Sequence, residues 1–302
     1  MIGEISVEDD GLSRLGSISL PFPLLKSGKV REVFELPDGR LLMVATDRVS
    51  AFDWVLTPPI PGKGVVLTRI SCFWFDRFAD VPNHLLSRTV EDVKGLDGYR
   101  HVLEGRTLVV ARARVFPFEF IVRGYLAGSA WEQYRRSGRA YGVELPKGLE
   151  LGARLPEPLL TLTTKAESGH DEPVSEARVR DALGGSVADE IFERSLEIYR
   201  DAHEEALSRG LILADTKFEW GEIDGRPTLV DELLTPDSSR YWDAEAYADG
   251  RIEQFDKQVV RDWLISTGWG RDCTPPPLPA EVVERTRRRY RELLGRLSGQ
   301  GR

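Results

Sequence analysis

Residues 212–221 read ILADTKFEWG, and this stretch decides how the rest of the chain is interpreted. Its first three residues are apolar, which predicts a strand that enters the core. Asp215, Lys217 and Glu219 then follow at every second position. Because a strand alternates its side chains between two faces, this spacing predicts three charged side chains on one face. The stretch therefore indicates a core strand that carries a charged stripe.

The strand is expected to continue into a β-hairpin whose second half contains VDELL, residues 230–234. The turn length matters because a slip of one residue reverses the facing of every side chain. A three-residue loop over 224–226 would place Asp231 opposite Glu219, whereas a two-residue turn would place Val230 there. We expect the three-residue loop because it brings two carboxylates together.

Composition and charge exclude several classes of protein. The chain has 302 residues, of which 41% are hydrophobic, so it can form a core and more than one subdomain. Its formal charge of -8 argues against a general nucleic-acid binder. Only two cysteines occur, Cys72 and Cys273, far apart and in no CxxC pattern, which suggests neither a disulfide framework nor a thiolate metal site. No signal peptide and no apolar stretch of roughly 20 residues is present, so we expect a cytoplasmic protein without a membrane span.

Hydrophobic patterning predicts a mixed α+β fold. Residues 31–46 read as a hairpin with a turn at Pro37, Asp38 and Gly39, and residues 107–115 read as a strand. Apolar residues at helical spacing predict helices elsewhere. The expected helices are 67–78, 128–134, 187–208, 254–266 and 281–297.

A basic turn near the N-terminus is a candidate phosphate site. KSGKVRE, residues 26–32, places Lys26, Lys29 and Arg31 around Gly28. A glycine lets the backbone approach a phosphate closely, and clustered cations compensate its charge. The segment is not a Walker A sequence, and three basic residues at a surface turn are usually just solvated, so both interpretations stay open.

Charges also interrupt an apolar run over residues 116–131. Glu119 and Arg123 would be costly to bury unless they pair with each other or bind a ligand. Arg123 offers a planar fork for a carboxylate or phosphate. Ser129, beside Gly128, offers a hydroxyl at the start of a helix.

Further polar groups follow in the second half of the chain. Asp215, Glu219 and Asp231 could supply oxygen ligands to Mg²⁺, with Lys217 neutralising a phosphate or carboxylate. The alternative is an exposed strand face with cross-strand salt bridges. Two loops add candidates: Ser239 and Arg240 in an expected turn over 237–240, and His170, Asp171 and Glu172, which suit hydrogen bonding or a magnesium shell better than zinc.

Taken together, these segments resemble the SAICAR synthetase family. The likeness runs in order through KSGKVRE, ATDRVSAFD, IPGKGVVLT, FEFIVRGYLAGSAWEQY, LTTKAESGHDE, ADTKFEWG, DELLTPDSSRYW and FDKQVVRDWL. Each piece is modest, but the ordered set is highly specific. Phe118 and Trp220 depart from the residues we would expect in the family, and both departures leave the charged positions intact.

The resemblance implies an ATP-dependent ligase of de novo purine biosynthesis. It would join L-aspartate to the carboxylate of CAIR, a phosphoribosyl-aminoimidazole carboxylic acid, through an acyl phosphate, giving SAICAR, ADP and phosphate. ATP and Mg²⁺ are the implied cofactors, and small molecules rather than nucleic acid or membrane are the implied partners. Two rivals are a small-molecule kinase, which would transfer phosphate without forming an amide, and a non-enzymatic nucleotide sensor.

The resemblance also implies residue roles. Lys26, Gly28, Lys29 and Arg31 would clamp the ATP phosphates, with Glu119 in the segment that meets adenine. Glu219 and Asp231 would bind Mg²⁺, and Lys217 and Arg240 would be catalytic. Arg123, Ser129, Asp215, Ser239 and Arg240 would bind CAIR. Asp256 and Lys257 lie in a matching segment without an assigned role.

The implied fold has two lobes, with C-terminal helices. Residues 1–112 would form a β-rich nucleotide-binding lobe that resembles the small lobe of kinases. Residues 113–302 would form an ATP-grasp-like lobe. ATP would lie between the lobes.

Overall fold

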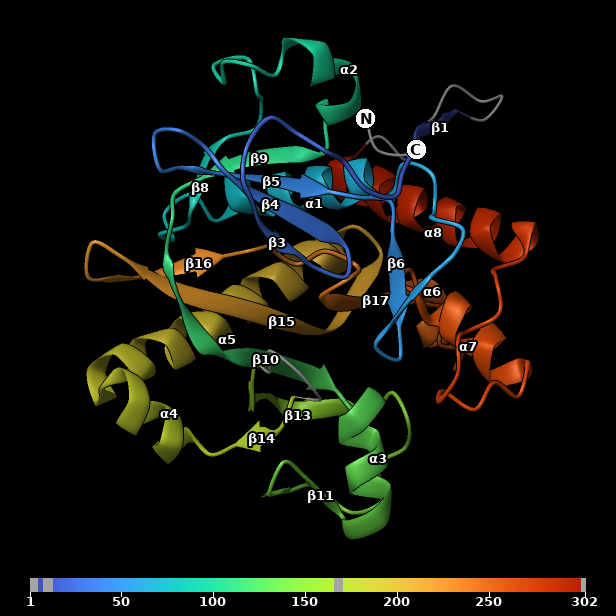
Figure 1. The fold of residues 1–302 in the computed structure, drawn as a ribbon. Helices are drawn as coiled ribbons and strands as arrows, with labels where there is room; N and C mark the ends of the chain where they lie inside the picture. The colour runs from blue at the N-terminus through green and yellow to red at the C-terminus, as the bar shows by residue number, and fades with distance from the viewer. Residues whose placement is uncertain (1–4, 8–12, 166–170, 300–302) are drawn as a thin grey trace.

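Two antiparallel sheets organise the chain (Figure 1). The computed structural model describes residues 5–7, 13–165 and 171–299. The first sheet has the strand order β3-β4-β5-β9-β8. The second has the order β14-β13-β10-β15-β16, and β17 pairs with β15 beside that path. The predicted mixed α+β class is confirmed.

The strands have the following bounds. The first sheet comprises β3 (Leu24–Ser27), β4 (Arg31–Glu35), β5 (Leu41–Ala45), β8 (Leu85–Ser87) and β9 (Thr107–Val110). The second comprises β10 (Arg114–Tyr125), β13 (Arg154–Thr164), β14 (Pro173–Val174), β15 (Leu211–Ile223), β16 (Arg226–Val230) and β17 (Ser239–Asp243). Short pairs are β1 (Ile5–Val7) with β2 (Ser13–Leu15), β6 (Val49–Ala51) with β7 (Trp54–Leu56), and β11 (Arg139–Ala140) with β12 (Val143–Glu144).

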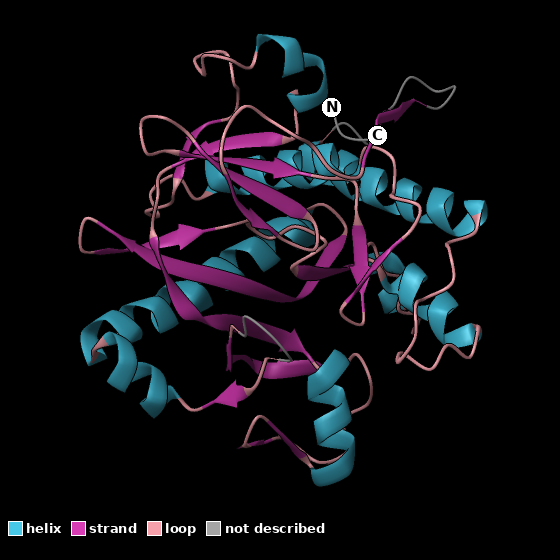
Figure 2. Cartoon of the chain, viewed as in Figure 1, coloured by secondary structure: helices cyan, strands magenta, loops and turns pink. Residues whose placement is uncertain are grey.

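Helices surround these sheets, as Figure 2 shows. They are α1 (Lys63–Arg77), α2 (Arg100–Leu103), α3 (Gly128–Ser137), α4 (Glu176–Leu183), α5 (Gly185–Ser208), α6 (Ala244–Ala248), α7 (Gln258–Ser266) and α8 (Ala280–Ser298), with a 3-10 turn at Asp97–Tyr99. In the described part of the chain, none of them is long and apolar enough to cross a membrane.

Helix α5 covers one face of the second sheet (Figure 1). Its apolar residues recur at helical spacing, so they form a stripe that packs on the strands. Phe192 of α5 shares a core with Phe218 and Trp220 of β15. The indole Nε1 of Trp220 donates a hydrogen bond to Ser195 Oγ at 3.1 Å. This face of the second sheet is therefore filled with core side chains.

Helix α1 joins the two sheets. Trp74 and Phe75 belong to the same core as the second sheet, whereas Cys72 packs against Met43 of the first. The start of the helix lies very close to β5, because a Cβ added at Gly64 would be 2.2 Å from the carbonyl oxygen of Ala45. Only a residue without a side chain fits this approach.

A β-bulge interrupts β15 within the opening stretch. Leu213 pairs with Tyr241, but Asp215 pairs with Arg240, so Ala214 is an extra residue on β15. A bulge changes the facing of the residues that follow it. Leu213 lies in the core beneath α5 before the bulge, and Phe218 occupies that core after it. The three charges of 215–219 are thereby turned to the opposite face.

The predicted register of the following hairpin is wrong. Glu219 pairs with Val230, not with Asp231, because Asp224 and Gly225 form a two-residue turn. Both turn residues have positive φ, 50° and 75°, the conformation that matches the twist of a hairpin and that Asp-Gly favours. Asp231 follows the end of β16 and itself has φ 65°, which takes it out of strand alternation.

Two other expectations need correction. The strand expected over 107–115 is divided, because β9 ends at Val110 and β10 begins at Arg114. The expected turn over 237–240 ends early, since Ser239 and Arg240 already belong to β17. The N-terminal hairpin and the five predicted helices are confirmed, with ends that differ by several residues.

Candidate functional site

The second sheet carries a charged face opposite α5. Glu119 and Arg123 of β10 stand opposite Glu219 and Asp215 of β15. Cross-strand partners share a face, and Lys217 lies on that face because it is two residues from each of its charged neighbours. The predicted stripe is therefore present and extends across two strands.

One end of this face is a lysine held among carboxylates. Lys217 Nζ lies 2.6 Å from Glu119 Oε1 and 3.1 Å from Glu219 Oε1. Lys165, at the end of β13, pairs with the other oxygen of Glu219. Burial alone would raise the pKa of Glu219, but the charges of Lys217 and Lys165 outweigh it and lower the pKa to about 2. Glu219 is thus a carboxylate at neutral pH.

The other end is a carboxylate held between arginines. Asp215 Oδ2 lies 2.5 Å from Arg240 Nη1 and 3.4 Å from Arg123 Nη1. The charge of Asp215 raises the pKa of Arg240. Arg123 also donates to the hydroxyl of Tyr141 at 3.2 Å, and that hydroxyl is 2.7 Å from Ser129 Oγ. Two fixed guanidinium groups and two hydroxyls suit a phosphate or carboxylate.

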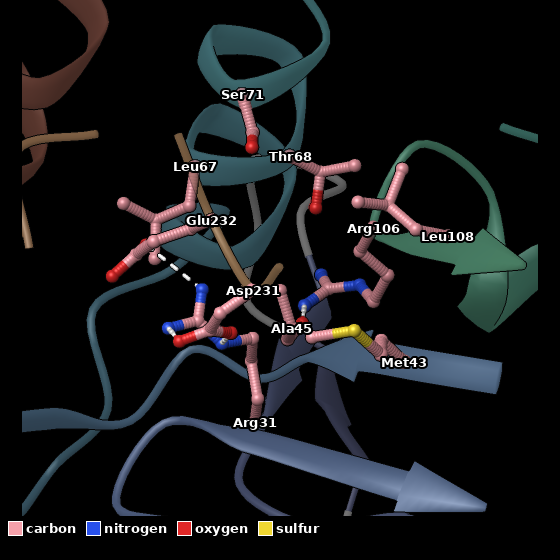
Figure 3. A pocket seen from close by; sticks show the side chains of 10 residues that line it. All are labelled: Arg31, Met43, Ala45, Leu67, Thr68, Ser71, Arg106, Leu108, Asp231 and Glu232. Atoms are coloured by element: carbon pink, nitrogen blue, oxygen red, sulfur yellow. Dashed lines mark hydrogen bonds and ion pairs between the residues drawn. The ribbon is translucent and has the colours of Figure 1, made fainter. Parts of the chain in front are cut away.

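The side chain of Asp231 pairs with Arg31 of the first sheet and does not stand opposite Glu219 in the hairpin (Figure 3). Arg31 of β4 binds both of its oxygens, at 3.0 and 3.1 Å, and reaches Glu232 at 2.8 Å. Burial raises the pKa of Asp231 to about 6; the charge of Glu219 adds to this shift, although Arg31 opposes it. Glu219 is therefore close enough to act on Asp231 despite the corrected register.

A small cavity lies beside this contact (Figure 3). It measures about 20 Å³ and is lined by Arg31, Asp231 and Glu232 together with residues of α1 and the first sheet. That volume is about the size of one water molecule, so the cavity cannot hold a nucleotide.

The basic turn between β3 and β4 lies at the surface. Lys26 and Lys29 are exposed, and Lys29 pairs with Asp53 at the tip of the β6–β7 hairpin. The guanidinium group of Arg48 holds the backbone of the turn, because it donates hydrogen bonds to the carbonyl oxygens of Gly28 and Lys29 at 2.8 and 3.2 Å. The cations of the turn thus remain accessible while its backbone is held.

Several predicted residues have other surroundings than expected. Glu119 and Arg123 do not pair with each other, because each meets a partner on β15. The hydroxyl of Ser239 is 2.8 Å from Thr216 Oγ1, so Ser239 lies on the face opposite Arg240. His170 lies outside the described residues.

The remaining segments have mainly structural contacts. Asp256 accepts a hydrogen bond from the backbone of Gln258 at 2.8 Å, and Arg261 lies 3.6 Å away, so Asp256 stabilises the start of α7. Burial lowers the pKa of its neighbour Lys257.

Asp47, in the segment that follows β5, also has a structural contact. It is fully buried and pairs with Arg106 at 2.9 Å.

The family model for SAICAR synthetase matches residues 24–276, which is most of the chain. The chain belongs to the SAICAR synthetase family. This family consists of ligases of purine biosynthesis that join L-aspartate to CAIR with ATP.

Curated SAICAR synthetases are similar over nearly their whole length. The phosphoribosylaminoimidazole-succinocarboxamide synthase of Syntrophobacter fumaroxidans is 51% identical over 282 residues, covering 92% of this chain and 93% of the relative. That of Chromobacterium violaceum is 48% identical over 277 residues, covering 90% and 97%.

Solved SAICAR synthetase structures share the fold. The enzyme from Saccharomyces cerevisiae, solved with SAICAR, has a TM-score of 0.85 at 37% identity and covers 94% of this chain and 98% of its own. A type-2 SAICAR synthetase solved with ADP has a TM-score of 0.69 at 23% identity, covering 91% and 97%, which is a likeness of fold.

The two residues that we did not expect in this family lie on the core face of the sheet. Phe118 and Trp220 are buried in the core beneath α5, on the face that carries no charged stripe. Two residues that lie at the candidate site, Lys165 and Tyr141, were not expected there from the sequence. Lys165 stands inside the LTTKAESGHDE segment of the resemblance, whereas Tyr141 has no sequence signal.

Proposed function

We propose that this chain catalyses the reaction of its family, the ligation of L-aspartate to CAIR with ATP, through an acyl phosphate. A carboxylate is a poor acyl donor because its oxygen is a poor leaving group. Transfer of the γ-phosphoryl group of ATP to the CAIR carboxylate gives an acyl phosphate and ADP. The aspartate amine then attacks the acyl carbon, and the C–O bond to phosphate breaks as the amide forms.

The proposal rests on the charged face of the second sheet, which has an arginine-rich end around Asp215 and a carboxylate-rich end around Lys217. The Asp215, Arg123 and Arg240 cluster offers fixed cations for the phosphate and carboxylate of CAIR. Two strand positions away from Asp215, Lys217 stands among carboxylates, a composition suited to a phosphoryl group and its metal. Lys217 and Arg240 would neutralise charge that develops on the transferring group, and no covalent enzyme intermediate is needed.

The nucleotide is assigned to the space between the two sheets. Lys26, Gly28 and Lys29 would hold the phosphates from the surface turn. Arg31 would act from beside Asp231, and Glu119 lies in the segment assigned to adenine. In this proposal residues 1–112 form a kinase-like small lobe and residues 113–302 an ATP-grasp-like lobe, although α1 of the first packs into the core of the second.

Glu219 and Asp231 are assigned to Mg²⁺. Within the described ranges, no three acidic, histidine or cysteine side chains gather as a metal cluster. Two carboxylates nevertheless fit Mg²⁺, which takes few protein ligands when phosphates and water complete its shell. Burial is the main cause of the raised pKa of Asp231, and the nearby charge of Glu219 adds to it; a divalent cation between the two carboxylates would favour the ionised form of Asp231. Mg²⁺ would neutralise phosphate charge, and Lys165 and Arg31 would release their carboxylates to it.

Phosphate release from ATP tests the proposal. The purified protein is incubated with ATP, Mg²⁺, CAIR and L-aspartate, and then with each component omitted in turn. We expect stoichiometric ADP, phosphate and SAICAR only in the complete mixture. ADP formation with a phosphorylated product that needs no aspartate would instead show a small-molecule kinase. ATP binding without turnover would show a nucleotide sensor.

A further inference from the structure

The bulge in β15 has a buried phenol behind it. Tyr199 of α5 donates a hydrogen bond from its hydroxyl to the carbonyl oxygen of Leu213 at 2.7 Å. The same hydroxyl is 3.3 Å from the carbonyl oxygen of Ala214, the extra residue of the bulge. Tyr199 is 2% exposed, and burial raises its pKa well above the ordinary value, so the phenol stays protonated and can donate. A bulge leaves backbone groups without ladder partners, and this hydroxyl supplies one.

The hydroxyl also fits against the neighbouring strand. A Cβ added at Gly124 of β10 would lie 2.0 Å from it. Gly124 follows Arg123, at the point where the pairing of β10 with β13 shifts register. The absence of a side chain at Gly124 is therefore what lets the phenol reach the bulge.

These contacts lie directly behind the arginine end of the site. Asp215 is the residue after the bulge, and Arg123 is the residue before Gly124, so the phenol touches the backbone next to both. Asp215 and Arg123 are themselves joined at 3.4 Å, and Asp215 holds Arg240. A change in the bulge would move the carboxylate that sets both guanidinium groups.

We propose that Tyr199 is a positioning residue for the CAIR site, because its hydroxyl fixes the β15 bulge that aims Asp215 at Arg240 and Arg123. The inference rests on the proposed assignment of those three residues to CAIR. Tyr199 contacts no substrate in this account and acts only through the backbone of Leu213 and Ala214.

Tyr199→Phe removes the hydroxyl and little else. Loss of one buried hydrogen bond is expected to raise the KM for CAIR about fivefold, with the KM for ATP changed less than about twofold. Tyr134→Phe is the matched control, since the hydroxyl of Tyr134 also donates a 2.7 Å hydrogen bond to a backbone carbonyl, that of Pro146, which is not next to Asp215 or Arg123 in the sheet. It should change neither KM. Melting temperatures of both variants report any general loss of stability.

Gly124→Ala tests the same contact from the other strand and does not require Tyr199→Phe to fold. Its Cβ would press on the hydroxyl, so the KM for CAIR should again rise selectively. In the Tyr199→Phe background the clash is smaller, and Gly124→Ala should then raise KM by a smaller factor. Equal factors in both backgrounds would contradict the proposed contact.

Asp215→Asn distinguishes failure of the CAIR assignment from failure of the positioning role of Tyr199. If it raises the KM for CAIR while Tyr199→Phe and Gly124→Ala do not, the CAIR assignment stands and the positioning role is wrong. If Asp215→Asn also leaves that KM unchanged, the CAIR assignment fails and the positioning role fails with it. A lower melting temperature of Tyr199→Phe with unchanged KM values would show a purely structural hydroxyl.

Discussion

Asp215 and Arg240 occupy paired positions on β15 and β17, and their side chains meet at 2.5 Å. The pair joins two segments 25 residues apart and fixes a guanidinium group beside the start of α3. A Cβ added at Gly128 would lie 2.5 Å from Arg240 Nη2, so the helix leaves room for this group and no more. The arginine is thus held from the sheet and limited by the helix.

Arg240→Lys should weaken CAIR binding although it keeps the charge. A lysine ammonium cannot reproduce the planar fork, so the KM for CAIR should rise about tenfold or more in steady-state assays. Gly128→Ala should act in the same direction by displacing the guanidinium group. Gly138→Ala is its control, because Gly138 also has positive φ, 72°, but faces open space. A selective effect of Gly138→Ala would contradict the steric explanation.

Asp231→Asn should weaken metal binding in the presence of nucleotide. Loss of one of two carboxylates is expected to lower the affinity for Mn²⁺ with ADP by about tenfold or more, measured by calorimetric titration. Glu232→Gln is the comparison, because Glu232 also pairs with Arg31 and is not assigned to the metal. If the two variants lose affinity equally, the effect lies in Arg31 and not in metal ligation.

Gly64→Ala should destabilise the fold. The added Cβ would meet the Ala45 carbonyl oxygen at 2.2 Å, and backbone on both sides resists displacement. Overpacking of this kind costs about 3 kcal/mol of unfolding free energy, measured by urea denaturation. Gly98→Ala has nothing within 4 Å of its Cβ and should change the unfolding free energy by less than about 0.5 kcal/mol.

Stability should fall with acid because two histidines are buried. Burial lowers the pKa of His203, and it lowers that of His84 to about 4, from an ordinary value of 6.5. The unfolded chain then binds more protons, so this stability is complete above pH 6.5 and declines as pH falls towards 4. His203→Asn should make urea denaturation less steeply pH-dependent between pH 7 and 5. Exposed His101→Asn should leave the profile unchanged.

The fold class and the charged stripe could be predicted from the sequence, because alternation and helical periodicity are local patterns. The facing of the stripe depends on the bulge at Ala214, and that bulge is held by Tyr199 from a distant helix. No local pattern encodes such a contact. The Asp224-Gly225 turn alone accounts for the hairpin register, and the expectation that Asp231 stands opposite Glu219 is wrong.

The site was predicted less completely for the same reason. Glu119, Arg123 and Lys217 stood out because charges in apolar runs are unusual. Tyr141 and Lys165 did not, since a tyrosine or lysine in a polar loop is ordinary until the fold brings it to Arg123 or Glu219. Asp231 reaches the site through a left-handed backbone that alternation cannot predict.

If the stripe of β15 is the catalytic face, Lys217→Ala must remove most of the activity. The measurement is the rate of SAICAR formation at saturating ATP, Mg²⁺, CAIR and L-aspartate. The control variant is Arg114→Ala, which removes a cation from an exposed ion pair with Glu222 between β10 and β15. We expect Lys217→Ala to lower turnover by about two orders of magnitude or more in a folded protein, while Arg114→Ala remains near normal. Normal turnover of Lys217→Ala would contradict a catalytic role of the stripe.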